Sequence, residues 1–182
     1  MKKRLLIDRK YKIVLRYLIL LVITIFSLPF IYKIFTPLTI NTSAFILDFF
    51  YDITINNSII ILDNQTFIQI IPACVAGSAY LLLLIINLTI PMSLDKRLKS
   101  ILLSCLLLFI ANIIRISLLS SLYHTNAPYV DFTHKLFWYG LSTVLVVLIW
   151  FIIVKIFSIK EIPVYTDIKH LKNNHLLLLT SK

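Results

Sequence analysis

Long apolar stretches alternate with short polar ones along most of this chain. Four of these stretches are long enough to cross a bilayer as a helix, which takes about 20 residues: residues 13–35, 72–92, 100–122 and 134–157. The segment between the first two, residues 36–71, contains short β-branched runs separated by turn residues such as Asn56-Asn57. This alternation predicts a small hairpin or a three-stranded meander. We therefore expect an all-α polytopic membrane protein, with about four transmembrane helices and a short β-like extracytoplasmic loop between the first two.

The composition supports this interpretation. Hydrophobic residues make up 59% of the 182 residues, charged residues make up 14%, and the mean hydropathy is +0.93. Soluble domains have about 45–50% apolar and about 25% charged residues, so an ordinary soluble domain is excluded. Two cysteines are too few for a disulfide scaffold. The first apolar stretch is too long for a cleavable signal peptide, and no small-x-small cleavage site follows it.

The basic residues gather on one side of the predicted helices. The chain has 18 Lys and Arg against 8 Asp and Glu, a formal net charge of +10. Fifteen of the 18 lie near the N-terminus, between the second and third stretches, or from the end of the fourth stretch (Lys155) onward. Segments rich in Lys and Arg stay in the cytoplasm. We therefore expect a plasma or inner membrane protein with a basic cytoplasmic N-terminus (1–12), a transmembrane domain (13–157) and a basic cytoplasmic tail (158–182). The predicted topology accounts for the positive net charge, so nucleic-acid binding is not needed to explain it.

Three residues with reactive or charged side chains fall on the outer side of this topology: Cys74, Arg115 and His134. A charge inside a membrane span costs roughly 2.5–3.5 kcal/mol or more, so Arg115 indicates a functional site. Asn112 lies one turn earlier on the same helix face. Cys74 follows Pro72 at the predicted start of the second helix, where exposed backbone amides stabilise a thiolate. His134 opens the fourth stretch.

The chain has only two glycines, Gly77 and Gly140. Gly77 lies one turn after Cys74, where the missing side chain leaves room for a substrate backbone. Gly140 follows His134 into its helix. Both glycines are therefore expected to support the site, as the floor of a narrow cleft at the outer ends of the last three helices.

Several alternatives remain open. His124, in the last outer loop, competes with His134, and Cys105, near the inner end of the third stretch, is interpreted as structural. We expect no metal and no other cofactor, because the outer face has no paired ligands at metal-binding spacing and the single glutamate, Glu161, lies on the opposite side. A non-enzymatic membrane protein, such as a transporter or assembly subunit, would instead use Arg115 and Asn112 as structural polar residues.

In this order and on successive helices, these residues resemble the exosortase/archaeosortase family of multipass membrane cysteine transpeptidases. The matching positions are Ala73-Cys74-Val75-Ala76-Gly77, Ala111-Asn112-Ile113-Ile114-Arg115 and His134, within roughly residues 50–157. The resemblance implies that Cys74, Arg115 and His134 are catalytic. In one departure, many members have Ser or Thr and then Gly directly after the cysteine, whereas Val75 and Ala76 stand before Gly77 here.

The activity that the resemblance implies is acyl transfer. Cys74 would cleave the C-terminal transmembrane sorting signals of exported surface proteins on the outer membrane face and form a thioester. The acyl group would then pass to an acceptor such as a lipid or an amine. His134 would serve as general acid and base, and Arg115 would stabilise the oxyanion. The implied partners are these substrate proteins, the lipid bilayer and a lipid acceptor.

Overall fold

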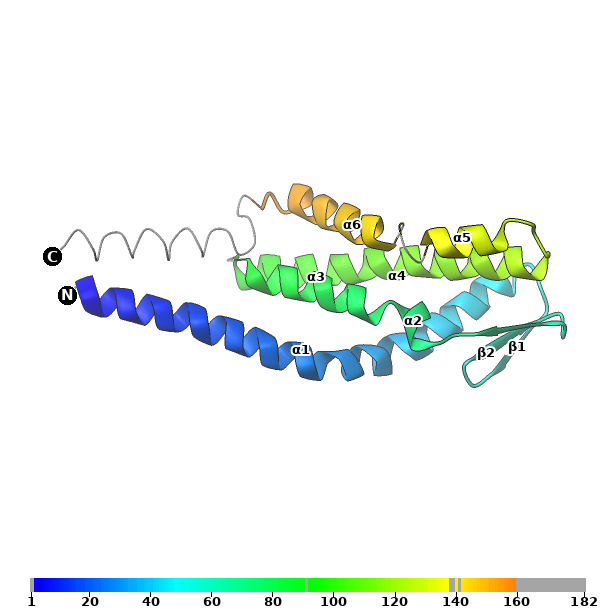
Figure 1. Ribbon diagram of the computed structural model, residues 1–182, viewed down its shortest axis with the longest axis horizontal. Helices are drawn as coiled ribbons and strands as arrows, with labels where there is room; N and C mark the ends of the chain where they lie inside the picture. The colour runs from blue at the N-terminus through cyan, green and yellow to red at the C-terminus, as the bar shows by residue number, and fades with distance from the viewer. Residues whose placement is uncertain (1, 91, 138–139, 141, 160–182) are drawn as a thin grey trace.

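The computed structural model is mostly helical (Figure 1) and describes residues 2–90, 92–137, 140 and 142–159. The elements follow in the order α1 (Lys2–Leu47), β1 (Ile53–Asn56), β2 (Ile59–Leu62), β3 (Thr66–Gln69), α2 (Pro72–Val75), α3 (Gly77–Thr89), α4 (Leu94–His124), α5 (Val130–Leu136) and α6 (Ser142–Ile156). The helices α1, α3, α4 and α6 run along the long axis, and the strands lie at one end of the molecule (Figure 1). From residue 160 onward, the predicted cytoplasmic tail lies outside the described residues.

Two helical segments are long and apolar enough to cross a membrane, namely Phe26–Leu47 within α1 and the whole of α4. The helices α3 and α6 are also apolar, but they have 13 and 15 residues. About 20 residues are needed to span a bilayer without thinning it or unwinding the helix ends. Among the described residues, α4 covers the predicted span 100–122, whereas Phe26–Leu47 overlaps the predicted span 13–35 only in part. The four-crossing topology stays a prediction.

The first helix is longer than the sequence predicts. A loop is expected from residue 36, yet α1 continues to Leu47 and includes Pro37. Proline removes one backbone hydrogen bond from a helix interior, so packing must hold this part of α1 together. Ile40, Ala44 and Leu47 are buried at the three- and four-residue spacing of one helix face. Burial of this face explains why the helix replaces the first third of the expected loop.

The three strands form an antiparallel meander in the order β1-β2-β3. The central strand carries Ile60 and Leu62, which are fully buried. They pack in one cluster with Leu47 of α1, Val75 of α2 and Ile116 of α4. This cluster fixes the sheet against the helix ends, immediately before the chain enters α2.

A second apolar cluster joins the long helices. Its buried members are Ile31 of α1, Tyr80 and Leu83 of α3, Leu108 of α4, and Val146, Ile149 and Ile153 of α6. Phe35 packs against both clusters and stacks on Tyr80, with the ring centroids 4.0 Å apart. Phe35 therefore connects the two clusters through α1, and apolar packing joins the sheet to the helices.

Two of the predicted spans are interrupted in the structure. The second, residues 72–92, breaks at Ala76, whose φ of 60° is left-handed, so that α2 is a separate turn from α3. The fourth, residues 134–157, is replaced by α5 and α6, with π-helical geometry at Phe137 and Gly140 between them. His134 therefore lies inside α5 instead of opening a membrane helix. The charges of Asp131 and Lys135 and the lack of any buried residue on α5 explain why this segment is not part of an apolar span.

Candidate active site

Cys74 lies in the single turn of α2, directly after the sheet. Pro72 begins this turn, a position that suits proline because the first helical N–H groups have no partner inside the helix. The Cys74 N–H bonds to the carbonyl oxygen of Ile71 at 2.8 Å. Its thiol is free of any disulfide and half-buried. A short turn on a buried cluster thus holds a reactive group that is still partly accessible.

Two side chains of α4 hold the main chain of this cysteine. Asn112 Nδ2 donates to the Cys74 carbonyl oxygen at 2.9 Å, and Arg115 Nη2 donates to the same oxygen at 3.0 Å. This oxygen lies in the last turn before Ala76, where helix carbonyls have no intrahelical partner. The sequence predicts that Asn112 and Arg115 share a helix face. The structure adds that this face binds the backbone of the cysteine.

A cavity of about 280 Å³ opens beside this contact. Cys74, Arg115 and His134 all line it, and its other walls come from the end of β3, from α4 and from α5. The three residues singled out in the sequence are therefore brought to one cavity from three different helices. A thiol, a guanidinium and an imidazole around one space are the groups that a cysteine acyl-transfer reaction needs.

Asp131 is a lining residue close to the histidine. It lies three residues before His134 on α5, so the two side chains share a helix face, and both line the cavity. His134 is exposed. The cavity therefore has an acidic side chain beside its imidazole.

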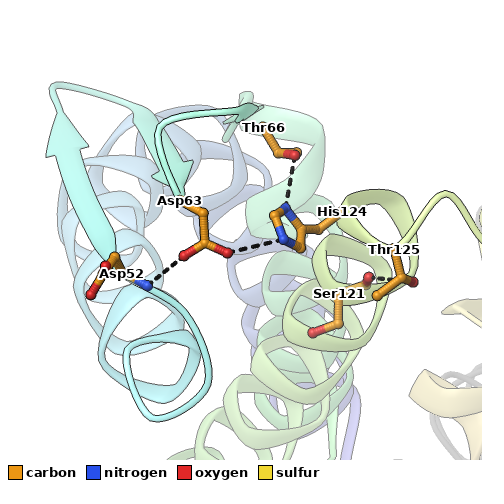
Figure 2. Close-up of polar contacts among 6 residues, drawn as sticks. All are labelled: Asp52, Asp63, Thr66, Ser121, His124 and Thr125. Atoms are coloured by element: carbon orange, nitrogen blue, oxygen red, sulfur yellow. Dashed lines mark hydrogen bonds and ion pairs between the residues drawn. The ribbon is translucent and has the colours of Figure 1, made fainter.

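The competing histidine has a different position. His124, the last residue of α4, does not line this cavity. Its Nε2 lies 3.1 Å from Asp63 Oδ2, and its Nδ1 lies 2.9 Å from Thr66 Oγ1 (Figure 2). Asp63 also accepts a hydrogen bond from the Asp52 N–H at 2.8 Å. His124 thus ties the sheet to the end of α4, and His134 is the histidine at the cavity.

The glycines do not line this cavity, and Gly77 does not leave the room for a substrate that the sequence predicts. A Cβ on Gly77 would lie 2.5 Å from Tyr32 Cζ. Gly77 therefore allows α1 to approach α3 and leaves no room there for a substrate. A Cβ on Gly140 would meet nothing within 4 Å, and neither glycine lines the cavity. The prediction assumed one continuous helix, whereas the turn at Ala76 separates Gly77 from the face that carries Cys74.

Arg115 also borders two further cavities, of about 200 and 390 Å³, on the side of α3 and α6. Ala76, Ala79 and Ser142 line both of them. Small side chains leave space between the helices, so the guanidinium can be approached from the side of the helices as well as from the sheet. The sequence did not indicate this second approach, nor the contribution of Gln69 and Ile70 to the main cavity. The sequence feature that could have indicated this contribution is the position of Gln69 and Ile70 shortly before Pro72 and Cys74.

Together, these features describe a membrane-helix protein with a candidate thiol site at one end of its helices. The family model described as transmembrane exosortase (Exosortase_EpsH) matches residues 6–154, which include all three candidate residues. The chain belongs to the transmembrane exosortase family and is a membrane protein. Membership indicates a membrane transpeptidase of the exosortase type. No curated protein and no solved structure matches the chain.

Proposed function

We propose that this protein is a membrane-embedded cysteine transpeptidase. It cleaves the C-terminal sorting signals of exported surface proteins on the outer membrane face and transfers the proteins to a lipid or amine acceptor. The observation that carries the proposal is that Cys74, Arg115 and His134 line one cavity of about 280 Å³. Family membership supplies the type of reaction, and the cavity supplies the groups for it.

The first half of the reaction forms a thioester. The Cys74 thiolate attacks the carbonyl carbon of the scissile peptide bond, and the carbonyl oxygen becomes an oxyanion. Arg115 stabilises this oxyanion, because a fixed cation in a site with little water is most effective where charge develops. As the C–N bond breaks, the His134 imidazolium gives its proton to the leaving amine. The sorting signal departs with that amine, and the surface protein stays bound to Cys74.

The second half of the reaction releases the surface protein. Neutral His134 takes a proton from the acceptor amine or hydroxyl, which attacks the thioester carbonyl. The C–S bond breaks, and the Cys74 thiolate and the His134 imidazolium are regenerated. The acceptor determines the product: an amine gives an amide, a lipid hydroxyl gives an ester, and water gives a free carboxylate.

Arg115 has enough hydrogen-bond donors for a structural and a catalytic task. A guanidinium has five N–H donors in a planar fork, and one of them bonds to the Cys74 carbonyl oxygen. Because Asn112 donates to the same oxygen, the main chain of the cysteine does not depend on the arginine alone. We infer that the remaining Arg115 donors serve the oxyanion.

The topology that we propose puts this cavity outside the cytoplasm. The helix α4 begins beside the basic residues Lys96, Arg97 and Lys99 and ends at His124 beside the sheet. The cavity is built at the second of these ends. Basic segments remain in the cytoplasm, so one crossing by α4 leaves the cysteine on the outer side.

The proposal is tested by replacing each of the two cysteines. The host strain would carry the wild type, Cys74→Ala or Cys105→Ala, and mass spectrometry would identify the C-termini of its surface proteins. Cys105 is the matched control, because it packs against the helix cluster away from the cavity. We expect Cys74→Ala to lower processing by at least about 1000-fold, the scale of losing a nucleophile, and Cys105→Ala to process normally.

Immunoblotting of membranes would establish that both variants accumulate equally. Normal processing by Cys74→Ala would overturn the proposal and favour a non-enzymatic role for Arg115 and Asn112. A lipid or amine on the new C-terminus would identify a transpeptidase, and a free carboxylate would identify a protease.

A further inference from the structure

We propose that the substrate segment just upstream of the scissile bond binds as an added strand along the free edge of β3. This inference rests on the proposed function, since the substrate is the one cleaved at Cys74. Pairing of an extended peptide with an exposed sheet edge is a common mode of peptide recognition, in which main-chain hydrogen bonds give affinity. The occupant is therefore a backbone in extended conformation.

The register of the sheet shows which backbone groups face the free edge. The Ile70 N–H bonds to the Ser58 carbonyl oxygen at 2.8 Å, so position 70 faces β2. Antiparallel strands alternate between residues that face the partner and residues that face away. Ile68 and Thr66 therefore also bond toward β2, and the backbone groups of Phe67 and Gln69 point away from it.

This edge is open in the part of the chain that the structure describes. No hydrogen bond joins the outward backbone groups of Phe67 or Gln69 to another described element. Phe67 is 63% exposed, and Gln69 is also exposed. Proteins usually block a sheet edge with charges or proline, and β3, which reads Thr66-Phe67-Ile68-Gln69, has neither. An extended chain can pair here without displacing any described contact of this backbone.

The open edge leads directly to the cysteine. Ile68, Gln69 and Ile70 line the same cavity as Cys74, and α2 follows β3 after two residues. The strand therefore ends where the scissile carbonyl must lie. Because the upstream segment of the substrate also runs toward the cysteine from the sheet side, the added strand is parallel to β3. The other free edge, on β1, does not contribute to this cavity.

Proline substitution tests this pairing with a matched pair of edges. A proline at an edge position whose N–H faces away from the sheet removes that donor but keeps the ladder to the neighbouring strand. Gln69→Pro makes this change on β3. Ile55→Pro makes it on β1, because the bond from the Asp63 N–H to the Asp52 carbonyl oxygen (2.9 Å) and the register turn Ile55 away from β2. Gln69→Ala changes the same side chain and keeps the N–H.

The readout is processing of a surface protein that wild-type cells cleave and Cys74→Ala cells do not. Loss of one main-chain hydrogen bond should slow processing by about twofold to tenfold in Gln69→Pro, and more than in Gln69→Ala. Ile55→Pro should process at the wild-type rate. Equal membrane levels of the two proline variants, with equal alkylation of Cys74, would show that both sheets fold.

The outcomes separate the inference from the function on which it rests. If no surface protein depends on Cys74, the proposed function and the strand pairing are both overturned. If processing depends on Cys74 but Gln69→Pro matches Ile55→Pro, or loses no more than Gln69→Ala, only the strand pairing is overturned. If Gln69→Pro fails to accumulate, Phe67→Pro replaces it, because the same register argument applies at that position, and the same comparisons decide.

Discussion

Ala76 is the residue whose backbone conformation separates the cysteine turn from the helix that follows. Its φ of 60° is a conformation that costs about 1–2 kcal/mol for a residue other than glycine. The break ends α2 after Val75 and leaves the Cys74 carbonyl oxygen for Asn112 and Arg115, which both donate to it. A continuous helix would have used that carbonyl internally. The local strain therefore makes the contact between α2 and α4 possible.

Gly77 gives a prediction at the same scale. Gly77→Ala should destabilise the protein by about 1–3 kcal/mol, the usual range for overpacking, because the new methyl group would lie 2.5 Å from Tyr32 Cζ. Thermal unfolding of the purified protein in detergent would measure it. Gly140→Ala is the control, since its methyl group meets nothing within 4 Å. In a Tyr32→Ala background the cost of Gly77→Ala should largely disappear. An equal cost in both backgrounds would contradict the contact.

The sheet and the end of α4 are joined by polar contacts as well as by the apolar cluster. His124 contacts Asp63, the residue directly after β2, and Thr66 at the start of β3, and Asp63 also accepts a hydrogen bond from the Asp52 N–H (Figure 2). One histidine thus binds both sides of the turn between β2 and β3. Because the cavity is partly walled by β3, the position of this turn affects the wall of the site.

His124→Ala should loosen the sheet and leave the helices intact. It removes two partners from partly buried groups, and each such loss costs about 1–3 kcal/mol. Amide hydrogen exchange within residues 53–69 should therefore become faster, while α4 keeps its protection up to its last turn. Thr125→Val is the matched control, because Thr125 Oγ1 donates to the Ser121 carbonyl oxygen at the same end of α4 and, among the described residues, forms no hydrogen bond with the sheet (Figure 2). Unchanged exchange in β3 of the His124→Ala protein would show that apolar packing alone holds the sheet.

The positions of the three strands follow from short-range patterns in the sequence. The strands begin at Ile53, Ile59 and Thr66, each at a β-branched run bounded by turn residues. The sequence does not predict the end of α1 or the break after α2, because tertiary packing determines both. The extension of α1 to Leu47 depends on burial against the sheet, and the break at Ala76 depends on contacts with α4.

The same distinction applies to the site. The order of Cys74, Arg115 and His134 on successive helices, with their common side of the membrane, predicted that they belong together. The contacts of Asn112 and Arg115 with a main-chain oxygen required the geometry of α2. The direction in which Gly77 faces could not be predicted either. An argument from helical spacing holds only within one unbroken helix, and the chain breaks between Cys74 and Gly77.

The whole molecule is polarised along its long axis. The sheet lies at one end of the molecule (Figure 1), where α4 ends and its last turns line the cavity together with β3. The second end of α4 is its start, beside Lys96 and Lys99. Toward that second end, Asn87 of α3 is buried with Ser100 and Ser104 of α4, and its Nδ2 donates to Leu83 O at 2.8 Å. Hydrogen bonds of this kind hold helices together in lipid, where apolar contact alone gives no preference for protein neighbours. None of these three polar residues lines the cavity that holds Cys74, Arg115 and His134.

This polarity predicts which ends of α4 face the two sides of the membrane. The helix has 31 residues and is therefore about 46 Å long, which exceeds the hydrocarbon core of about 30 Å. In a Cys74→Ala, Cys105→Ala background, Asn64→Cys in the turn before β3 should react with an impermeant maleimide in intact cells. Lys96→Cys in the first turn of α4 should react only after permeabilisation, and the background protein should not react. Labelling of Lys96→Cys in intact cells, with Asn64→Cys protected, would show that the topology is the reverse of the proposed one. It would also put the cavity in the cytoplasm, where exported surface proteins could not reach Cys74 after export.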